Sequence, residues 1–451
     1  MTEAAAGAPA IDATFTHGAT MRHVLVMSAT GAIGLIAIFV VDFLSLLYVS
    51  WLNDPVLVAG VEYATQVLFF LVSVSIGLAI AVTALVSRAI GAGDPEAARR
   101  LAASTLVHVF VTGNVLALLV FLFRGELLRA VGAEGPAYAV ADRFLVISVP
   151  ANALLGLGMS LSGVLRAAGD ARRAMYVTLF GGIATAGLDP LLIFGLGLGV
   201  DGAAISTVLA RLVVVAVGVW GAVGVHGLVA RPRLGDALRD LPALAAIAGP
   251  AILTNLAAPV SNGYVLRVFS RFGESSVAAF AIIDRITPLA FALLYAMSGS
   301  VGPIVGQNYG ARLFDRVRRT LTDCFTLSLA YSLIVWLALF LAAPRLADLF
   351  GAVGRTREIV LFYCAFGVAA WLFFACVFVA NAAFNNLGHP LLATIFNWGR
   401  ATLGTIPFVT VGARLQGPEG AYIGLLVGSA AFGIASVWAS LAITRRLARR
   451  E

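Results

Sequence analysis

The sequence predicts an all-α polytopic membrane protein in which twelve transmembrane helices form two parallel-repeat six-helix bundles with a central cleft. The first observation is composition: 60% of the residues are hydrophobic, 12% are charged and the mean hydropathy is +0.96, whereas soluble domains contain about 25% charged residues. The second is a series of apolar runs, each about 20 residues or longer and able to cross a membrane. The third is an internal repeat that spans six of these runs.

The charged residues and the cysteines exclude several classes of protein. The net charge is +7, and all thirty Lys and Arg positions are arginines, scattered in short groups between the apolar runs. A nucleic-acid-binding protein gathers its positive charge in a patch with stacking aromatic residues, so this class is excluded. The three cysteines, Cys324, Cys364 and Cys376, lie in or beside apolar runs. They indicate neither a disulfide framework nor a metal site, and no cofactor is expected apart from a coupling ion.

The chain begins with a polar segment, and the apolar runs follow it at regular intervals. Residues 1–17 are small and polar, without the basic segment and cleavage site of a signal peptide, so we expect a short disordered tail and a retained first helix. The runs lie at 24–50, 56–86, 104–123, 137–163, 175–197, 203–228, 243–268, 276–304, 322–343, 358–386, 392–412 and 419–443.

The arginines are unequally divided between the connectors on the two sides of the membrane. One side receives the groups around Arg88, Arg166, Arg231 and Arg312 and the terminal "RRLARRE", while the opposite connectors hold fewer arginines, more evenly matched by acids. Arginine-rich loops remain in the cytoplasm under the positive-inside rule. We therefore expect a multi-pass protein of the cell inner membrane with both termini in the cytoplasm.

The internal repeat divides the chain into two halves of equal orientation. The segments "LVSRAIGAGDPEAARR" at 85–100 and "IVGQNYGARLFDRVRR" at 304–319 align at an offset of 219 residues. Six runs separate the copies, and an even number keeps both halves in the same orientation, as in parallel-repeat transporters. The predicted parts are an N-terminal lobe at 18–228, a cytoplasmic linker at 229–241, a C-terminal lobe at 242–444 and a basic tail at 445–451.

Two aspartates lie inside apolar runs of the first half. Asp42 is followed by "FLSLLYVSWL", and Asp189 lies within "GLDPLLIF". At about 1.5 Å per helical residue, both reach a similar depth in the outer half of the membrane, and so does Thr207. A carboxylate in hydrocarbon costs about 2.5 to 3.5 kcal/mol and normally faces a cavity or a partner. The three side chains therefore indicate a buried polar pocket.

Three strings of the sequence resemble the multidrug and toxic compound extrusion (MATE) transporters. They are "TALVSRAIGAGD", "GPIVGQNYGA" and "GVLRAAGDARRAMYVTLFGGIATAGLDPLLIFGLGLGVDGAAISTVLA", and the resemblance extends over residues 20–445. It implies a twelve-helix, two-lobed antiporter that exports cationic and amphipathic organic compounds in exchange for protons or sodium ions. The same superfamily contains flippases of lipid-linked oligosaccharides, so the cargo is less well defined than the fold.

The resemblance also implies an ion-coupling site in the N-terminal lobe. Proton-linked members place an aspartate in helix 1, an Asn-x-x-x-Asp pair in helix 5 and a threonine in helix 6. Asp42, Asp189 and Thr207 match these positions, while Thr185 replaces the asparagine. A carboxylate pair with few neutral oxygens favours a proton over sodium, which needs several ligands. Alternative roles are a position at the outer interface or a fixed hydrogen bond for Asp42, a kink at Pro190 for Asp189, and hydroxyl bonds of the threonines to their own helices.

The C-terminal lobe offers candidates for cargo binding rather than for ion coupling. The runs at 243–268 and 358–386 contain no acid, although sodium-linked relatives carry acids in the corresponding helices. Asp284, Asn255 and Asn262 are the candidate substrate-binding residues, and an ion pair between Asp284 and Arg400 is the structural alternative.

The expected function is secondary active export of organic cations or amphipaths by alternating access, by a protein that acts as a monomer in the lipid bilayer. Protonation of a buried carboxylate abolishes its desolvation penalty, so one proton can shift the equilibrium between two states. A flippase of lipid-linked sugars remains the alternative, although its cleft needs several basic residues for a pyrophosphate. A membrane-embedded enzyme needs clustered His, Ser or Asp residues, and the sequence contains no such cluster.

Overall fold

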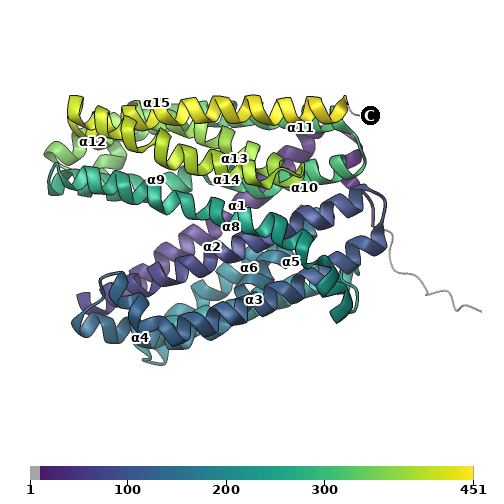
Figure 1. Ribbon diagram of the computed structural model, residues 1–451. Coiled ribbons are helices and arrows are strands. Elements are labelled where there is room, and N and C mark those ends of the chain that lie inside the picture. Colours follow the sequence, from purple (N-terminus) through teal and green to yellow (C-terminus); the bar gives the residue numbers. More distant parts are fainter. Residues whose placement is uncertain (1–10, 450–451) are drawn as a thin grey trace, which may run out of the picture. The chain divides into compact units, whose positions relative to one another are not determined.

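The computed structural model describes residues 11–449, and all regular structure in this range is helical. Packing divides the chain into two compact units. Unit 1 comprises the residues up to His17 together with Ile33–Ile252, and unit 2 comprises Gly18–Ala32 together with the residues from Leu253 onward. In Figure 1 most of unit 1 is blue to teal and most of unit 2 is green to yellow. The predicted all-α membrane fold is confirmed.

Unit 1 is built from long antiparallel helices joined by tight turns. Its helices are α2 (Pro55–Gly91), α3 (Pro95–Ala130), α4 (Gly135–Ser148), α5 (Asn152–Ala167), α6 (Ala171–Pro190) and α7 (Gly199–Val219), with 3₁₀ turns η1 (Thr14–Thr16) and η2 (Val149–Ala151) and π-helical turns η3 (Leu191–Gly195) and η4 (Trp220–Val225). α2 packs against α5, α3 and α4, and α6 against α7. The core of this unit includes Val82, Val86 and Leu165. Its many alanines let the helices pack closely.

The turns of unit 1 follow from a repeated Gly-Asp pair. Gly93 and Gly169 adopt φ values of +73° and +86°, a conformation that glycine reaches without steric cost. The aspartate that follows each glycine then begins the next helix. Asp94 accepts a hydrogen bond from the backbone N–H of Ala97 at 2.8 Å, and Asp170 from that of Arg173 at 2.9 Å. Such caps satisfy the free N–H groups of a first helical turn.

Unit 2 repeats this architecture with more interruptions. Its helices are α9 (Glu274–Ala290), α10 (Ala292–Gly310), α11 (Phe314–Leu349), α12 (Gly354–Ala365), α13 (Ala370–Asn386), α14 (Pro390–Gly399) and α15 (Ile406–Ala448), with the 3₁₀ turn η5 (Gly367–Ala369) and the π-helical turn η6 (Arg400–Gly404). α9 and α10 meet at a 48° bend next to Phe291. Pro288 lies inside α9 and removes a backbone donor near this bend.

The element α15 is a helical hairpin rather than one long helix. Gln416 and Gly417 have non-helical backbone angles, with φ of −140° and +63°. The two arms are in backbone contact, because a Cβ atom added to Gly428 would lie 1.6 Å from the carbonyl oxygen of Gly404, and one added to Gly412 would lie 2.0 Å from that of Gly420. Such contacts require glycine, as in other closely packed membrane helices.

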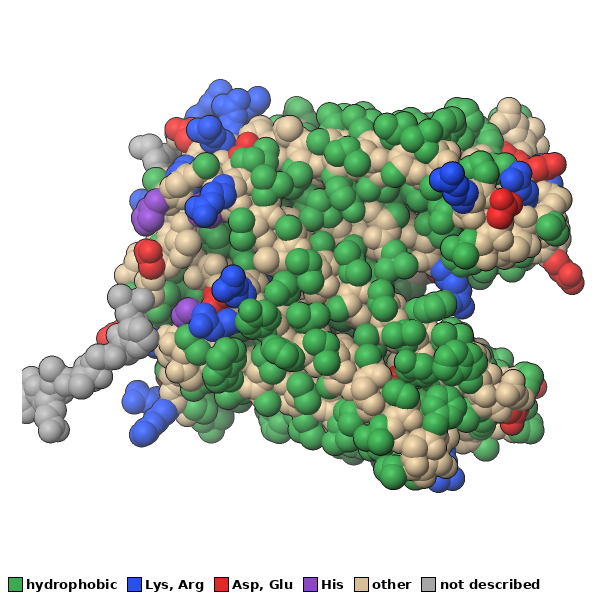
Figure 2. Space-filling view, turned by 180° about the vertical axis from the view of Figure 1, so that it is seen from behind, with side chains coloured by type: hydrophobic (Ala, Val, Ile, Leu, Met, Phe, Trp, Pro, Cys, Tyr) green, Lys and Arg blue, Asp and Glu red, His purple; other side chains and the backbone are tan. Residues whose placement is uncertain are grey.

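The hairpin reconciles the number of membrane spans with the sequence. Among the described residues, ten helices are long and apolar enough to cross a membrane, and the bent pair α9 and α10 makes eleven. One of the ten, Pro390–Ala448, contains both arms of the hairpin, which the break at Gln416–Gly417 divides. Counting these arms separately gives the twelve predicted spans. Figure 2 shows hydrophobic side chains over the middle of this face and most charged side chains toward its left and right ends, as expected for a protein in a bilayer.

Two long helices contribute to both units. α1 (Thr20–Ser50) begins in unit 2 and continues in unit 1 from Ile33, while α8 (Leu234–Ser270) begins in unit 1 and continues in unit 2 from Leu253. The start of α1 is fixed within unit 2 by a hydrogen bond from the Thr20 hydroxyl to the Asp323 carboxylate. The Ser300 hydroxyl also donates to the carbonyl of Met27 at 2.9 Å.

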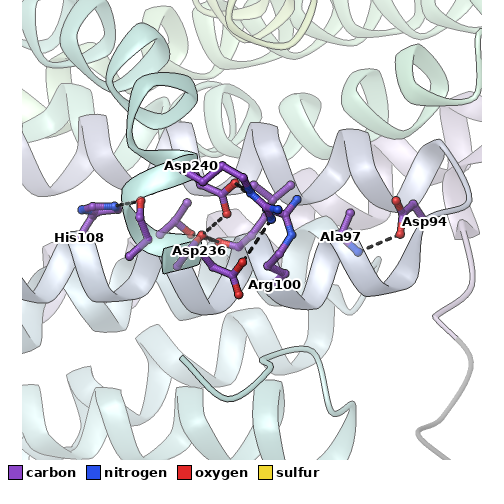
Figure 3. Close-up of polar contacts among 11 residues, drawn as sticks. Asp94, Ala97, Arg100, His108, Asp236 and Asp240 are labelled. Atoms are coloured by element: carbon purple, nitrogen blue, oxygen red, sulfur yellow. Dashed lines mark hydrogen bonds and ion pairs between the residues drawn. The ribbon is translucent and has the colours of Figure 1, made fainter. Parts of the chain in front are cut away.

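Polar contacts with α3 fix the start of α8 within unit 1 (Figure 3). Asp240 is 6% exposed and accepts hydrogen bonds from Arg100 at 2.6 Å and from Ser104 at 2.8 Å. The ring nitrogen Nε2 of His108 lies 2.8 Å from the carbonyl oxygen of Ala237.

Both predicted polar segments differ from the structure in part. The predicted linker 229–241 is helical from Leu234 onward, because its second half forms the first turns of α8 and carries the buried Asp240. The predicted disordered tail 1–17 is ordered from residue 11, where Phe15 is 2% exposed and anchors the segment in unit 1. Residues 1–10 and 450–451 lie outside the described residues.

Candidate functional site

Asp42 and Asp189 lie close together inside unit 1. Asp189 ends α6 directly before Pro190 and the π-helical turn η3, and it is 1% exposed. Asp42 lies in the second half of α1, where protein surrounds its carboxylate on most sides although the side chain is exposed at the surface of the unit. The two carboxylates are close enough to interact electrostatically. One acid is therefore sealed and the other is accessible, as transfer of an ion into a buried site requires.

The buried carboxylate has one clear hydrogen-bond partner. The hydroxyl of Ser45 donates to Oδ2 of Asp189. Ser45 is three residues after Asp42 in α1, so both side chains lie on the same face of the helix. Ser206 of α7 lies beside the Asp189 carboxylate and is fully buried, but its hydroxyl oxygen makes no hydrogen bond of acceptable geometry. Neither serine is predicted from the sequence, where the one available signal is the three-residue spacing of Ser45 from Asp42.

The two candidate threonines are oriented toward their own helices. The hydroxyl of Thr185 donates to the carbonyl of Gly181 at 3.1 Å, and that of Thr207 to the carbonyl of Ala203 at 3.0 Å. These are the ordinary backbone bonds of threonine within a helix. Both residues are half-buried, and their predicted part in ion coupling stays a prediction.

The corresponding place in unit 2 contains neutral residues. Ser261 aligns with Asp42 at the repeat offset, and its hydroxyl oxygen lies 3.2 Å from that of Thr405. Three residues further, Tyr264 aligns with Ser45 and lies 2.5 Å from the hydroxyl of Thr410. The repeat therefore places polar contacts between α8 and the segment after η6 where unit 1 has its carboxylates. Among the aligned positions that the structure describes, only the first copy carries a pair of carboxylates.

The cargo candidates of unit 2 are distributed over two helices. Asn255 is half-buried and Asn262 is exposed on α8, while Asp284 is exposed on α9. The alternative ion pair between Asp284 and Arg400 is wrong for the described residues, because none joins them. The guanidinium carbon of Arg400 instead lies 4.4 Å from the ring centroid of Phe374. The Asp284 side chain is exposed on α9, whereas the Arg400 side chain is buried in η6.

A protein-family comparison matches most of the chain. The MatE family model matches residues 32–191 and 250–411. The two matched segments correspond to the two halves of the internal repeat.

Individual relatives extend over nearly the full length. The chain is 27% identical to the FAD transporter of Shewanella oneidensis, with 92% of this chain and 93% of the relative covered. It is 25% identical to the probable multidrug resistance protein NorM of Thermotoga maritima, with 82% and 81% covered. The solved structure of the Vibrio cholerae MATE transporter VcmN in its bent form matches with a TM-score of 0.90 at 25% identity, covering 95% of this chain and 98% of that one.

Proposed function

Because the chain belongs to the MatE family, we propose that it is a secondary active exporter that moves organic compounds outward in exchange for protons. As a member of this family it is a multi-pass membrane transporter and not an enzyme. The proposal includes the exchange reaction, the coupling ion and the cargo. It also includes the location in the inner membrane with both termini in the cytoplasm.

The observation that carries the proposal is the asymmetric carboxylate pair of unit 1. Asp189 is sealed and Asp42 is accessible, and the aligned positions of unit 2 hold hydroxyl groups. A proton entering at Asp42 can neutralise one of two interacting charges, which lowers the cost of keeping both acids in a low-dielectric site. The charge of the pair can therefore bias a conformational equilibrium, which is the requirement for coupling an ion to transport.

The arrangement of oxygen atoms favours a proton over sodium. A proton needs one carboxylate oxygen, whereas a metal cation of this kind needs several oxygen ligands at once. The described contacts of Asp189 supply one serine hydroxyl, and the Thr185 and Thr207 hydroxyls are engaged with their own helices.

The cargo that we propose is an amphipathic organic compound, with cations as the first class to test. The named relatives include a probable multidrug resistance protein and an FAD transporter, so small organic molecules are the common property. Exposed Asp284 supplies a carboxylate that can attract a cation. A lipid-linked oligosaccharide flippase remains the alternative, and a compound such as FAD is a second candidate because a named relative is an FAD transporter.

Transport in inverted vesicles under separate ion gradients tests the proposal. We expect uptake of a fluorescent cation to follow an imposed proton gradient and to be insensitive to a sodium gradient at equal pH. Asp42→Asn retains the shape and hydrogen-bonding capacity of the side chain but removes the charge. This variant should reach the membrane at the wild-type level and lose gradient-driven transport, while Asp42→Glu should retain part of it.

Two results would contradict the proposal. Transport driven by sodium at clamped, equal pH would assign a different coupling ion. Normal gradient-driven transport by a well-expressed Asp42→Asn variant would remove Asp42 from the coupling site. Protein level and transport are measured on the same vesicles, so a folding defect is distinguished from a coupling defect.

A further inference from the structure

Four charged side chains are buried among the described residues, and one of them has no polar partner. Asp189 accepts from Ser45, Asp240 accepts from Arg100 and Ser104, and Arg211 donates to the carbonyl of Ser148 at 3.0 Å. Arg400 is the fourth, with 5% of its surface exposed. Its side chain makes no hydrogen bond or ion pair with the described residues, and its Nε is buried without a partner.

A guanidinium in this position is costly unless something compensates its charge. An unpaired charge inside a membrane protein is expensive, and such residues normally face a bound ligand, a water-filled cavity or a partner. The contact with Phe374 at 4.4 Å offsets part of this cost through the negative face of the ring. Arg400 also begins the π-helical turn η6, a type of turn that often occurs at functional sites.

One face of α13 supplies aromatic surface beside Arg400. Trp371, Phe374, Phe378 and Asn381 recur at spacings of three and four residues and are all half-buried. The Trp371 ring lies 5.1 Å from Phe374, and the Tyr295 ring of α10 lies 5.6 Å from Phe378, between ring centroids. Oδ1 of Asn381 is buried and without a hydrogen-bond partner. The face therefore combines rings that remain partly open with two unpaired polar groups.

Asp284, an acid that shares Tyr295 as a neighbour, does not neutralise Arg400. Tyr295 is within electrostatic range of both Asp284 and Arg400, so the tyrosine lies near both charges. Asp284 nevertheless makes no ion pair with Arg400 and is exposed. Arg400 therefore lacks a negative partner within the described residues. An anionic ligand can supply this missing charge.

We propose that this face of unit 2 binds a flat aromatic compound that carries a carboxylate or phosphate group, with the anion on Arg400 and the ring packed against the half-buried Phe374 and Phe378. The planar guanidinium presents several N–H donors in a fork that matches carboxylate and phosphate oxygens. The aromatic plane of the ligand would cover the half-buried rings. This inference rests on the proposed function, because it adds a class of anionic aromatic compound to the cargo that the exporter carries.

Binding of two dyes with the same ring system tests the inference. Fluorescein at pH 8 is an anion and rhodamine 123 is a cation, and both contain the flat xanthene rings. We expect the purified protein to bind fluorescein, measured by fluorescence anisotropy at fixed pH. Arg400→Gln should weaken that binding about 10- to 100-fold, as expected for loss of hydrogen bonds to a charged group. Arg400→Lys should weaken it less, because it keeps the charge but loses the fork.

The matched control is Arg414→Gln, which removes one exposed arginine elsewhere in unit 2 and should leave fluorescein binding unchanged. Rhodamine binding by Arg400→Gln serves as the test of correct folding and should stay within about twofold of wild type. Wild-type protein that does not bind fluorescein, or equal fluorescein binding by wild type and Arg400→Gln, would overturn the inference. The proposed function would survive either result if cation transport still followed the proton gradient. Fluorescein binding without any gradient-driven transport would overturn the proposed function alone.

Discussion

At the scale of single residues, Ser45 determines the environment of the most deeply buried acid. Its hydroxyl is the clear donor to Asp189, which is 1% exposed. Ser45→Ala would remove this hydrogen bond at a cost of about 1 to 3 kcal/mol and would let the carboxylate move. We expect the variant to accumulate in the membrane but to transport several-fold more slowly under a fixed proton gradient, measured in inverted vesicles.

Ser50→Ala is the control for this experiment. Ser50 ends the same helix, and its hydroxyl donates to the carbonyl of Leu47 at 2.7 Å, so its loss should not change transport. Equal rates for both serine variants would mean that the Ser45 hydroxyl does not position Asp189 in a way that matters for coupling.

The two acids of the site could be predicted from the sequence, whereas their partners could not. Asp42 and Asp189 are conspicuous because a carboxylate inside an apolar run is costly. Ser45 and Ser206 are not, since serine is tolerated almost anywhere in a membrane helix. The ion pair of Asp284 with Arg400 was wrong because equal depth along two helices does not determine which way the side chains turn.

At the scale of elements, the start of α6 contains a carboxylate that makes its stability depend on pH. Burial tends to raise the pKa of Asp170, but the backbone N–H of Arg173, the His226 ring and the Arg173 guanidinium outweigh it and lower that pKa below its ordinary value. Nε2 of His226 lies 2.7 Å from the Asp170 carboxylate, and the Arg173 guanidinium donates to the same carboxylate at 2.6 Å. These contacts stabilise the charged form, so their contribution is complete above the ordinary pKa and is lost as pH falls through the folded-state value.

We therefore expect the advantage of wild type over Asp170→Asn to depend on pH. Thermal unfolding in detergent should show wild type more stable near neutral pH, with the difference shrinking as the pH falls below about 4, where the carboxylate becomes protonated. Asn can still cap the helix, so the comparison isolates the charge. An advantage that is constant from neutral to acidic pH would contradict this assignment.

The hairpin α15 should be intolerant of any side chain at its contact points. A Cβ atom on Gly428 would lie 1.6 Å from the Gly404 carbonyl oxygen, so the two arms would have to separate. We expect Gly428→Ala to destabilise unit 2 by about 1 to 3 kcal/mol or more and to reduce the amount of folded protein recovered in detergent. Gly263→Ala in α8 meets nothing within 4 Å and should be tolerated or slightly stabilising. Similar yields for the two variants would show that the arms can separate at little cost.

The sequence predicts where most elements lie but not how they are interrupted. The predicted runs at 392–412 and 419–443 lie on either side of the break at Gln416–Gly417, because hydropathy is enough to locate the two spans. The π-helical turn η6 leaves no periodic signal, since it shifts the backbone register by about one residue within an apolar run. The bend at Phe291 likewise lies inside an apolar run, where hydropathy does not reveal it.

At the scale of the whole molecule, the internal repeat predicts two related halves but does not predict the division into packing units. An offset of 219 residues pairs the segments at 85–100 and 304–319. The packing units nevertheless exchange the first parts of α1 and α8, which a repeat in sequence cannot reveal because it carries no information on contacts. The cytoplasmic location of both termini and the monomeric state stay predictions.

The exchange of helix ends has a consequence for biosynthesis. The first turns of α1 emerge early from the ribosome, but Thr20 bonds to Asp323, which is 303 residues later in the chain. At about 5 to 20 residues per second, translation of that interval takes roughly 15 to 60 s. During this time Gly18–Ala32 must wait in the bilayer for partners that do not yet exist. Unit 2 can therefore be completed only after the first helix has already been inserted. Nascent chains stopped before residue 323 should remain sensitive to quality-control proteases.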